Sequence, residues 1–316
     1  MWRYVRNRLL WMIPVILGVT WLIFTLLYFV PGDPAYTILG ASATEEQLEA
    51  LRESLGLNDG YFVRFFRYLN DVYLHFDFGS SYVGGTSVTA EIMERLPKTL
   101  TLCLGSVFIA MIIGIPLGVN AAVHQGGFWD SASMLLALAG VSMPAFWVGL
   151  LLVLVFALRL GILPSVGYDG IEFFILPWIA NSFQGMATQA RQTRSAMLEV
   201  INSDFVTTAR AKGLSKRKVI FGHALPNALI PVITVAGTSL GKMLGGTVVI
   251  ESLFAIPGIG SYLITGINAR DYPVVMATVI ILAIMFALIM LLVDLLYAAV
   301  DPRIKAQYAS RGRRKG

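Results

Sequence analysis

Residues 207–226 read TTARAKGLSKRKVIFGHALP and form a basic, polar island in a chain that is otherwise mostly apolar. Uncharged runs long enough to cross a membrane lie upstream and downstream of this island. Lysine and arginine accumulate in the cytoplasmic loops of membrane proteins, so the island is expected on the cytoplasmic side. The pattern predicts an all-α membrane protein with a structured cytoplasmic loop.

The composition also indicates a polytopic membrane protein. Hydrophobic residues make up 56% of the 316 residues and charged residues only 14%, with a mean hydropathy of +0.71. A soluble core could not hide this much apolar surface. The net charge of +5 does not indicate nucleic acid binding, because the basic residues stand beside apolar segments. The single cysteine, Cys103, excludes an intramolecular disulfide and argues against a cysteine-ligated metal site.

Apolar segments long enough to cross a hydrocarbon layer about 30 Å thick recur along the chain. Six membrane-spanning helices are predicted, at residues 9–30, 99–123, 132–158, 173–190, 228–250 and 274–299. Lysine and arginine are distributed asymmetrically, with sixteen on the inferred inner side and seven on the outer side. This asymmetry predicts that both termini are cytoplasmic. A cleaved signal peptide is disfavoured, because the first apolar run is too long for one.

The spans divide the chain into segments of different character. Residues 31–97 carry ten carboxylates against four arginines, which suits an extracytoplasmic excursion. This excursion is either a platform for a partner or a cover over the span ends. The predicted segments are 1–30 (cytoplasmic N-terminus and span one), 31–97 (excursion), 98–300 (five-span core, containing a coupling loop at 191–226) and 301–316 (basic cytoplasmic tail).

Two helices are predicted within the excursion. Thr44 and Gln47 have the spacing of a capping box, which begins a helix, and Gly56 is placed to end it. A second, aromatic helix is expected from Tyr61 to about Phe76.

Glycines predict where the spans pack closely. Gly114 and Gly118 in the second span lie four residues apart, and Gly237, Gly241 and Gly245 repeat that spacing in the fifth. Small residues at this spacing share one helix face and let another helix approach.

Polar residues inside the spans are candidates for a solute path. The fourth span has a polar second half and is expected inside the bundle, with Asn181, Gln184 and Thr188 on one face. These three side chains either line a path or make interhelical hydrogen bonds. Lys242 in the fifth span either snorkels toward the cytoplasm, pairs with a carboxylate or lines the path. In the third span, Pro144 is expected to cause a kink.

The basic island should fold as a short helix-turn-helix. Residues 199–212 are compatible with a helix, Gly213 can supply a left-handed stop, and Ser215 can cap the next helix. Pro226 marks the return toward the fifth span. The alternative is an ordinary basic loop without a partner.

Enzyme-like patterns in the chain do not have the required context. The sequence GTSLG at 237–241 fits a nucleophile elbow, which needs a strand-turn-helix, but it lies in an apolar helical run. His75, His124 and His223 all fall outside the predicted spans, so an intramembrane serine protease lacks its base. The pair Gly241-Lys242 lacks the serine or threonine of a phosphate loop, so the chain is not expected to bind ATP by that route. No cofactor is expected on this chain itself.

The basic island resembles the EAA loop of ABC importer permeases. In that loop a glycine lies four residues beyond the EAA triplet, and a Leu-Pro pair lies twelve and thirteen residues beyond the glycine. The triplet here is replaced by TTA, and His223 replaces the usual isoleucine. The sequence TARAKGL at 208–214 is similar to the loop of dipeptide, oligopeptide and nickel permeases. The coupling residues implied by the resemblance are Thr207, Thr208, Ala209, Arg210, Ala211, Lys212, Gly213, Leu225 and Pro226.

Further motifs extend the resemblance over nearly the whole chain. They are PGDP (31–34), LGL (55–57), DFGSS (77–81), RLP (95–97), SMP (142–144), Glu251 with FAIPGIG (254–260), RDYP (270–273), DLLY (294–297) and DPR (301–303).

The resemblance implies a type I ABC importer permease in a bacterial or archaeal cytoplasmic membrane. Its partners would be a second, similar permease, two cytoplasmic ATPase subunits that use ATP and Mg, and an extracytoplasmic solute-binding protein. Closure of the ATPases would turn an inward-open path outward through the loop. Short peptides are the expected cargo, followed by nickel or its chelates. A proton-coupled carrier is disfavoured, because Lys242 alone titrates near a span centre.

Overall fold

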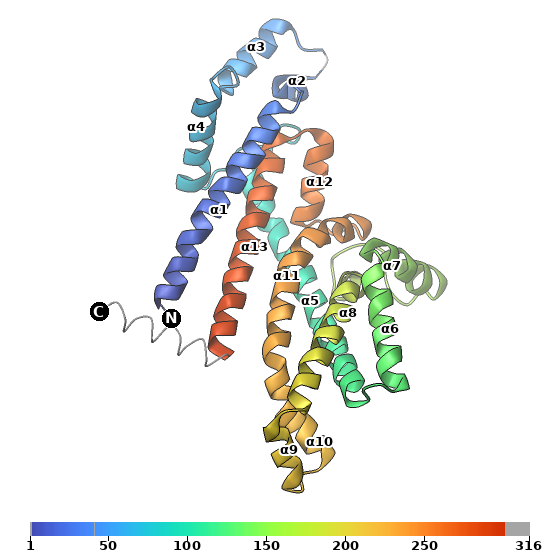
Figure 1. Ribbon diagram of the computed structural model, residues 1–316. Helices are drawn as coiled ribbons and strands as arrows, with labels where there is room; N and C mark the ends of the chain where they lie inside the picture. The colour runs from blue at the N-terminus through green and yellow to red at the C-terminus, as the bar shows by residue number, and fades with distance from the viewer. Residues whose placement is uncertain (1, 41, 301–316) are drawn as a thin grey trace, which may run out of the picture.

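The computed structural model describes residues 2–40 and 42–300, and this part of the chain is mostly helical (Figure 1). The elements in order are α1 (Trp2–Phe29), α2 (Pro34–Leu39), α3 (Glu45–Ser54), α4 (Tyr61–Leu74), α5 (Val88–Val123), α6 (Phe128–Ser142), α7 (Ala145–Leu152), the π-helix η1 (Val153–Arg159), α8 (Glu172–Ile201), α9 (Asp204–Ala211), α10 (Lys216–Lys218), the π-helix η2 (Val219–Ala224), α11 (Leu225–Leu253), α12 (Ile259–Ala269) and α13 (Tyr272–Val300).

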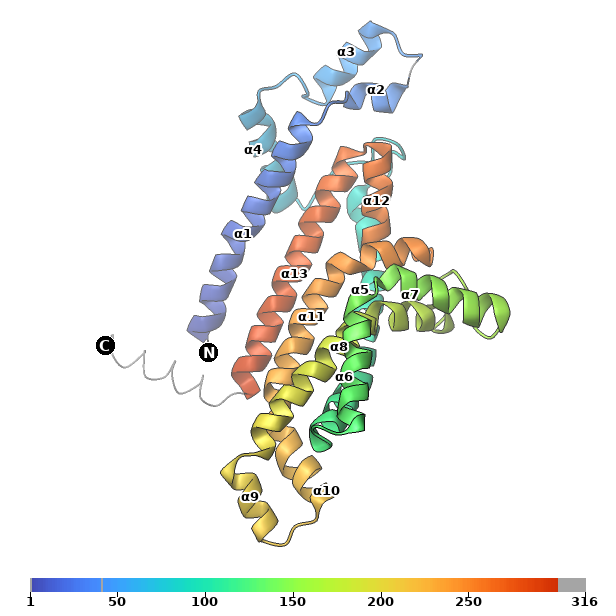
Figure 2. The same ribbon diagram turned by 45° about the vertical axis from the view of Figure 1, so that its right-hand side comes forward.

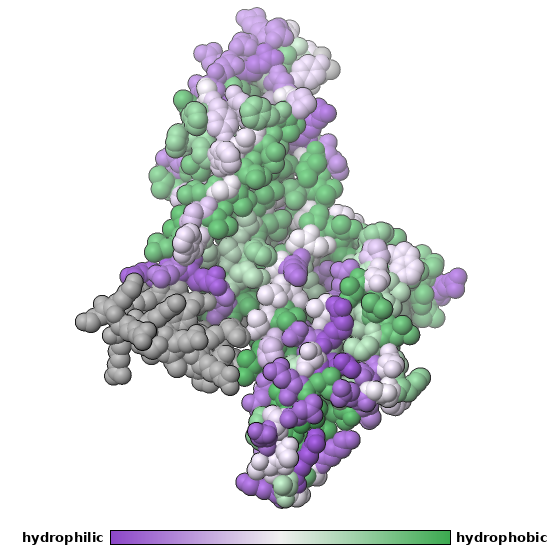
Figure 3. All heavy atoms as spheres, viewed as in Figure 1, coloured by the Kyte–Doolittle hydropathy of each residue, from purple (hydrophilic) through white to green (hydrophobic). Residues whose placement is uncertain are grey.

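The long helices lie side by side and carry different elements at their two ends (Figures 1 and 2). Helices α9 and α10 form one tip, and α2, α3 and α12 lie toward the opposite end. Hydrophobic residues cover α1, α13, α6 and α7, whereas hydrophilic residues gather at both ends and along α8 and the lower part of α11 (Figure 3). This banding is that of a multi-pass membrane protein.

Four helical stretches among the described residues are long and apolar enough to cross a membrane. They are Val5–Phe29, Val88–Val123, Lys216–Leu253 and Tyr272–Leu295. They coincide with the predicted first, second, fifth and sixth spans. The second helix starts earlier than expected, since α5 begins at Val88 inside the predicted excursion.

The third predicted span is wrong as a single kinked helix. Helices α6 and α7 meet at 102° across a break at residues 143–144, and Figure 2 shows α7 turned away from the long axis of α6. Pro144 disfavours the helical conformation at the residue before it, and Met143 has extended angles, φ −89° and ψ 127°. The helix therefore ends here, and the pair forms a broken span or a re-entrant loop.

Helix α8 lies inside the bundle, packed against α5, α6, α7 and α11, as predicted. The glycine pair of α5 faces it. A Cβ atom on Gly114 would lie 2.7 Å from the carbonyl oxygen of Met186, and one on Gly118 would meet the carbonyl oxygen of Ala190. Only glycine allows the two backbones this close, which confirms the predicted packing.

The glycines of α11 are only partly explained by packing. A Cβ atom on Gly237 would meet Val293, and one on Gly241 would lie 2.5 Å from Cε of Met290, so both glycines face α13 closely. Nothing lies within 4 Å of the corresponding position on Gly245. The predicted groove is therefore confirmed for the first two glycines and wrong for the third, which is exposed.

The outer helices follow their local sequence signals. The Thr44 backbone N–H donates to Oε1 of Gln47 at 3.0 Å, and the Gln47 N–H donates back to Oγ1 of Thr44, so the capping box is confirmed. Gly56 ends the helix region with φ +63°. The aromatic helix is also confirmed, as α4.

Short α2 was not predicted, although its signals are local. Asp33 accepts a hydrogen bond from the Ala35 N–H at 2.9 Å, and Pro34 begins the helix. Arg52 of α3 also donates to Asp33, at 3.0 and 2.6 Å. Burial by itself raises the pKa of the Asp33 carboxyl, but the hydrogen bond from Arg52 brings this pKa below its ordinary value. The guanidinium thus holds α2 and α3 together.

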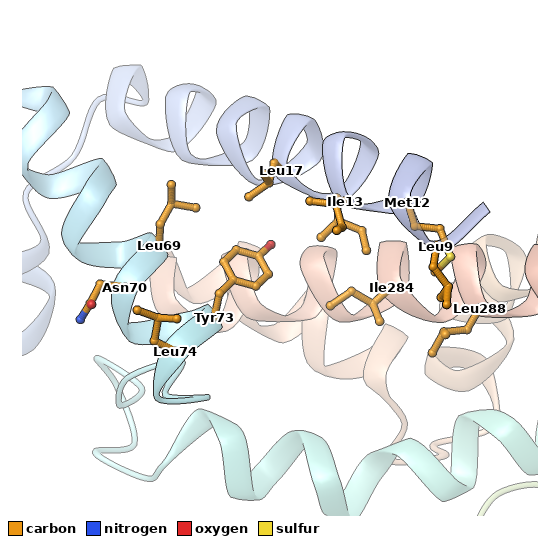
Figure 4. A pocket seen from close by; sticks show the side chains of 11 residues that line it. Leu9, Met12, Ile13, Leu17, Leu69, Asn70, Tyr73, Leu74, Ile284 and Leu288 are labelled. Carbon is orange, nitrogen blue, oxygen red and sulfur yellow. The ribbon is translucent and has the colours of Figure 1, made fainter. Parts of the chain in front are cut away.

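An apolar groove lies among α1, α4 and α13 (Figure 4). Its volume is about 740 Å³, and its lining includes Leu9, Ile13, Ile284 and Leu288. Its polar side chains are the amide of Asn70 and the hydroxyl of Tyr73, and no charged residue lines it. Its chemistry is that of a surface facing lipid tails.

Candidate functional site

The turn between α8 and α11 forms the tip segment (residues 202–224). The predicted helix at 199–212 is wrong at its start, since residues 199–201 belong to α8 and the helix breaks before α9. Asn202 donates to the Leu198 carbonyl at 2.9 Å, and Ser203 donates to the Val200 carbonyl at 2.6 Å. Such side chains compete for backbone groups and end helices.

The turn at Gly213 has the predicted geometry. Its φ of +78° is left-handed, a conformation that glycine adopts without strain. The Gly213 N–H donates to the Arg210 carbonyl at 2.9 Å, and the Leu214 N–H donates to the Ala209 carbonyl at 3.4 Å. Ser215 then caps α10 by accepting from the Lys218 N–H. The tip segment is a helix-turn-helix, as predicted.

Apolar contacts fix the tip segment to the long helices. Val206 and Ala209 are the buried residues of α9. They belong to a cluster shared with α5, α8, η2 and α11, whose other members are Val119, Ala122, Ala196, Met197, Val219, Ile220, Ala224, Ala228 and Val232. Because a packed core transmits displacement rather than absorbing it, a movement of α9 must carry the ends of α5, α8 and α11 with it.

The predicted coupling residues do not form one continuous surface. Thr207, Thr208, Arg210, Ala211, Lys212 and Gly213 are exposed at the tip, whereas Ala209 is 8% exposed and turned into the bundle. Leu225 is half-buried and Pro226 is exposed at the start of α11. Leu225 and Pro226 therefore lie just outside the tip segment, where α11 begins.

The sequence pattern missed Phe205, whose side chain is 46% exposed on α9. Burial of residues 206 and 209 requires that 205, 208 and 212 share the outer face, at helical spacing. An exposed aromatic side chain beside threonine and lysine is typical of a binding surface, where aromatic residues are enriched. The signal was available as an aromatic residue on the polar side of an amphipathic helix.

An ion pair near the tip was also missed. Arg194 of α8 donates through Nε and a terminal nitrogen to the two carboxylate oxygens of Asp130, at 2.6 and 2.7 Å. The Asp130 side chain is 7% exposed and also accepts from the Gly126 N–H at 3.0 Å. The pair ties the start of α6 to α8. Its partners are 64 positions apart, so spacing alone does not reveal it.

The three polar residues of α8 have different environments. Asn181 is 6% exposed and donates to Oγ of Ser106 on α5 at 3.0 Å, which is an interhelical hydrogen bond. Gln184 is exposed and donates to the Met143 carbonyl at 3.3 Å, at the break between α6 and α7. Thr188 is half-buried and donates to the Gln184 carbonyl.

Lys242 is exposed on α11 and makes no hydrogen bond or ion pair within the described part of the chain. Its position relative to α8 follows from a neighbouring contact, because a Cβ atom on Gly185 would lie 2.6 Å from Cε of Met243. Helices α8 and α11 run antiparallel through the tip (Figure 1). Gln184 directly precedes Gly185, and Lys242 directly precedes Met243. One residue back along a helix is a rotation of about 100°, and in an antiparallel pair this rotation goes to the same side on both helices. Gln184 and Lys242 therefore share one face.

No group of three histidine, cysteine, aspartate or glutamate side chains that could hold a metal ion occurs among residues 2–40 and 42–300. Ser239 of the GTSLG sequence lies within α11 and not on a strand-turn-helix. The geometry offers a tip packed against α5, α8 and α11 and a polar face that α8 and α11 share.

Comparison with known proteins matches both halves of the chain to membrane components of the same kind of transport system. Residues 114–306 match the family described as the binding-protein-dependent transport system inner membrane component. Residues 1–103 match the N-terminal family of the same transport system membrane components.

The relatives are permease proteins matched along their full length. The chain is 41% identical to the dipeptide transport system permease protein DppB of Alkalihalophilus pseudofirmus, over 96% of this chain and 99% of the relative. It is 40% identical to the glutathione transport system permease protein GsiC of Escherichia coli K12, with the same coverage.

Solved structures share the fold. A structure of the methionine ABC transporter MetNI in inward-facing conformations matches with a TM-score of 0.58 at 20% identity, covering 67% of this chain and 97% of that chain. An amino acid ABC transporter crystallised with histidines matches with a TM-score of 0.53 at 15% identity, covering 67% and 94%.

Proposed function

Because the chain belongs to the family of inner membrane components of binding-protein-dependent transport systems and is an ABC importer permease rather than an enzyme, we propose that it forms half of a path for short peptides. The observation that carries the coupling part of this proposal is the tip segment, which is exposed outward and packed inward against α5, α8 and α11. A second, similar permease forms the other half of the path.

The proposed topology has six spans with both termini in the cytoplasm of a bacterial or archaeal cell. Helix α8, which is more polar than the four apolar stretches, supplies the predicted fourth span, and its 30 residues extend about 45 Å. The pair α6 and α7 supplies the broken span. The start of α1 lies toward the half of the molecule that holds the tip (Figures 1 and 2), and the basic residues favour the same side.

The tip segment is the proposed docking site for one of two cytoplasmic ATPase subunits. The exposed residues 207, 208 and 210–213, together with Phe205, form the contact, and the cluster beneath α9 carries ATPase closure into the bundle. ATP and Mg belong to the partner subunits. The packed contact supplies the two-state element that nucleotide binding biases.

The proposed path runs along the face of α8 and α11 that carries Gln184 and Lys242, bordered by Thr188. Asn181 contributes by holding α8 against α5 through Ser106. Helices α2, α3 and α4, in the predicted excursion, form the side on which a solute-binding protein delivers its cargo.

Short peptides are the substrate class that the relatives favour, since dipeptide and glutathione permeases are 40–41% identical to this chain over its length. Glutathione is itself a small peptide-like anion. No observation favours nickel or a metal chelate over peptides.

The test uses a complete complex of this chain, the second permease, both ATPases and the binding protein in proteoliposomes. ATP-dependent accumulation of radiolabelled dialanine or glutathione is the expected result, and a complex with a catalytically inactive ATPase is the control. Equal uptake with and without hydrolysis, or none of either peptide by an intact complex, would reject the proposal.

A further inference from the structure

We propose that the Lys242 ammonium group binds the terminal carboxylate of the transported peptide midway along the path. This inference rests on the proposed function, and it assigns the anionic end of the substrate to one side chain of this chain. The chemistry is a charge-assisted hydrogen bond between an ammonium group and a carboxylate.

Lys242 lies well inside α11, away from both of its ends. It lies 17 residues after Leu225 and 11 before Leu253, which places it about 25 Å and about 16 Å from the two ends of α11. A hydrocarbon layer is about 30 Å thick, and a charged side chain within it is costly unless it faces protein or water. The exposed ammonium group therefore requires an aqueous or protein-lined surface.

The face that carries Lys242 is open in this chain. Gly245 and Gly246, one turn further along α11, have nothing within 4 Å of an added Cβ atom, and both are exposed. The face of α11 toward α13 is instead occupied, as the packing of Gly237 and Gly241 shows. Small residues beside an exposed cation leave room for a ligand to approach the ammonium group.

Three carboxylates of the bundle already have partners within the chain. Asp294 pairs with Arg8 at 2.8 Å, and Asp130 pairs with Arg194. Glu251 accepts from the Thr99 hydroxyl at 2.7 Å and from the Ser261 N–H at 2.8 Å, and it is 0% exposed.

Lys242 forms no ion pair with a carboxylate within residues 2–40 and 42–300, so an anion that binds its ammonium group comes from outside them. The exposed Gln184 amide on the same face can add a second donor to a carboxylate. A peptide terminus supplies such an anion and moves with the cargo, which allows binding to be transient.

Substrate discrimination tests the inference directly. Uptake of dialanine and of dialanine amide is measured with the complete complex carrying wild-type chain, Lys242→Arg or Lys242→Met. Each variant is scored by the ratio of acid to amide uptake relative to the wild-type ratio, so the fixed preference of the binding protein cancels. Lys242→Met should lower this ratio about tenfold, the effect of losing one hydrogen bond to a charged group, and Lys242→Arg should retain most of it.

Chemical labelling gives a second readout that does not depend on transport. Cys103 is the only native cysteine of this chain and is fully buried, so Lys242→Cys introduces one accessible thiol. It should react with a membrane-impermeant anionic thiosulfonate, and excess dialanine with binding protein and ATP should slow the reaction. Leu288→Cys in the apolar groove of Figure 4 is the matched control and should not react.

The outcomes separate the possibilities. An unreactive Lys242→Cys means that position 242 faces lipid rather than an aqueous path, and it overturns the inference. An unchanged acid-to-amide ratio in Lys242→Met, or loss of the second permease from that complex, assigns the lysine to subunit pairing and also overturns it. Failure of the wild-type complex to import any peptide rejects the proposed function instead.

Discussion

Replacement of Gly213 by valine should uncouple transport from ATP without unfolding the chain. The glycine has φ +78°, and nothing lies within 4 Å of an added Cβ atom. The substitution therefore causes no clash, and its whole effect comes from the backbone. A left-handed conformation costs an L-residue about 1–2 kcal/mol, and asparagine is one of the few side chains that tolerate it.

That strain predicts the size of the effect. A cost of about 1–2 kcal/mol reduces the population of the native turn by a factor of roughly 5–30. If the native turn is the form that docks on the ATPase, uptake should fall by a similar factor in Gly213→Val whenever docking on the ATPase limits the rate. Gly213→Asn should lose much less, because its side chain can occupy the same backbone region.

The assay is ATP-driven uptake of dialanine in proteoliposomes, normalised to the amount of this chain reconstituted. Thermal stability of the detergent-solubilised complex is measured in parallel. Because the tip is held by Val206 and Ala209, which the substitution does not touch, the membrane core should melt at an unchanged temperature. Wild-type uptake by Gly213→Val, or equal losses in the valine and asparagine variants, would refute the reasoning.

Three further substitutions test the packing, the ion pair and the docking surface. Gly118→Leu should destabilise the bundle by about 1–3 kcal/mol because its side chain meets the α8 backbone, whereas Gly245→Leu, in open space, should melt like wild type; equal melting temperatures would contradict the close approach. Arg194→Met should lower the free energy of unfolding by about 2 kcal/mol, because Asp130 is left without its cation. Adding Asp130→Leu to this variant should recover part of the loss. If the two substitutions instead give additive losses in thermal melting, the ion pair does not stabilise the chain. Phe205→Ala should weaken ATPase association about tenfold or more by pull-down titration, and unchanged binding would place the contact elsewhere.

Local features of the chain were predictable because their causes lie within a few residues. The capping box of Thr44 and Gln47 depends on groups three positions apart. The turn at Gly213 and the cap at Ser215 follow equally local rules. The closeness of Gly114 and Gly118 to another helix followed from side-chain size, although the identity of that helix did not.

The bend at Pro144 marks the limit of local reasoning. Proline predicts that the helix is disturbed, but the angle of 102° depends on the surfaces that α6 and α7 find on the neighbouring helices. Gly140 of α6 packs near Ala187 of α8, while a Cβ atom on Gly149 of α7 would lie 2.7 Å from Leu253. Both halves pack against α8, but α6 also contacts α5 whereas α7 also contacts α11, and these contacts set the direction of each half.

The candidate site shows the same division. Sequence alone determined that the chain is a helical membrane protein, that its basic loop turns at a glycine, and that Lys242 is an anomalous charge, because composition and short-range periodicity carry this information. Only the tertiary structure decided that Asn181 bonds to Ser106, that Arg194 meets Asp130, and that Lys242 stands free beside open space within the described residues. The physical reason is that such contacts join positions dozens of residues apart, and their energies depend on distances and burial that exist only once the helices have packed.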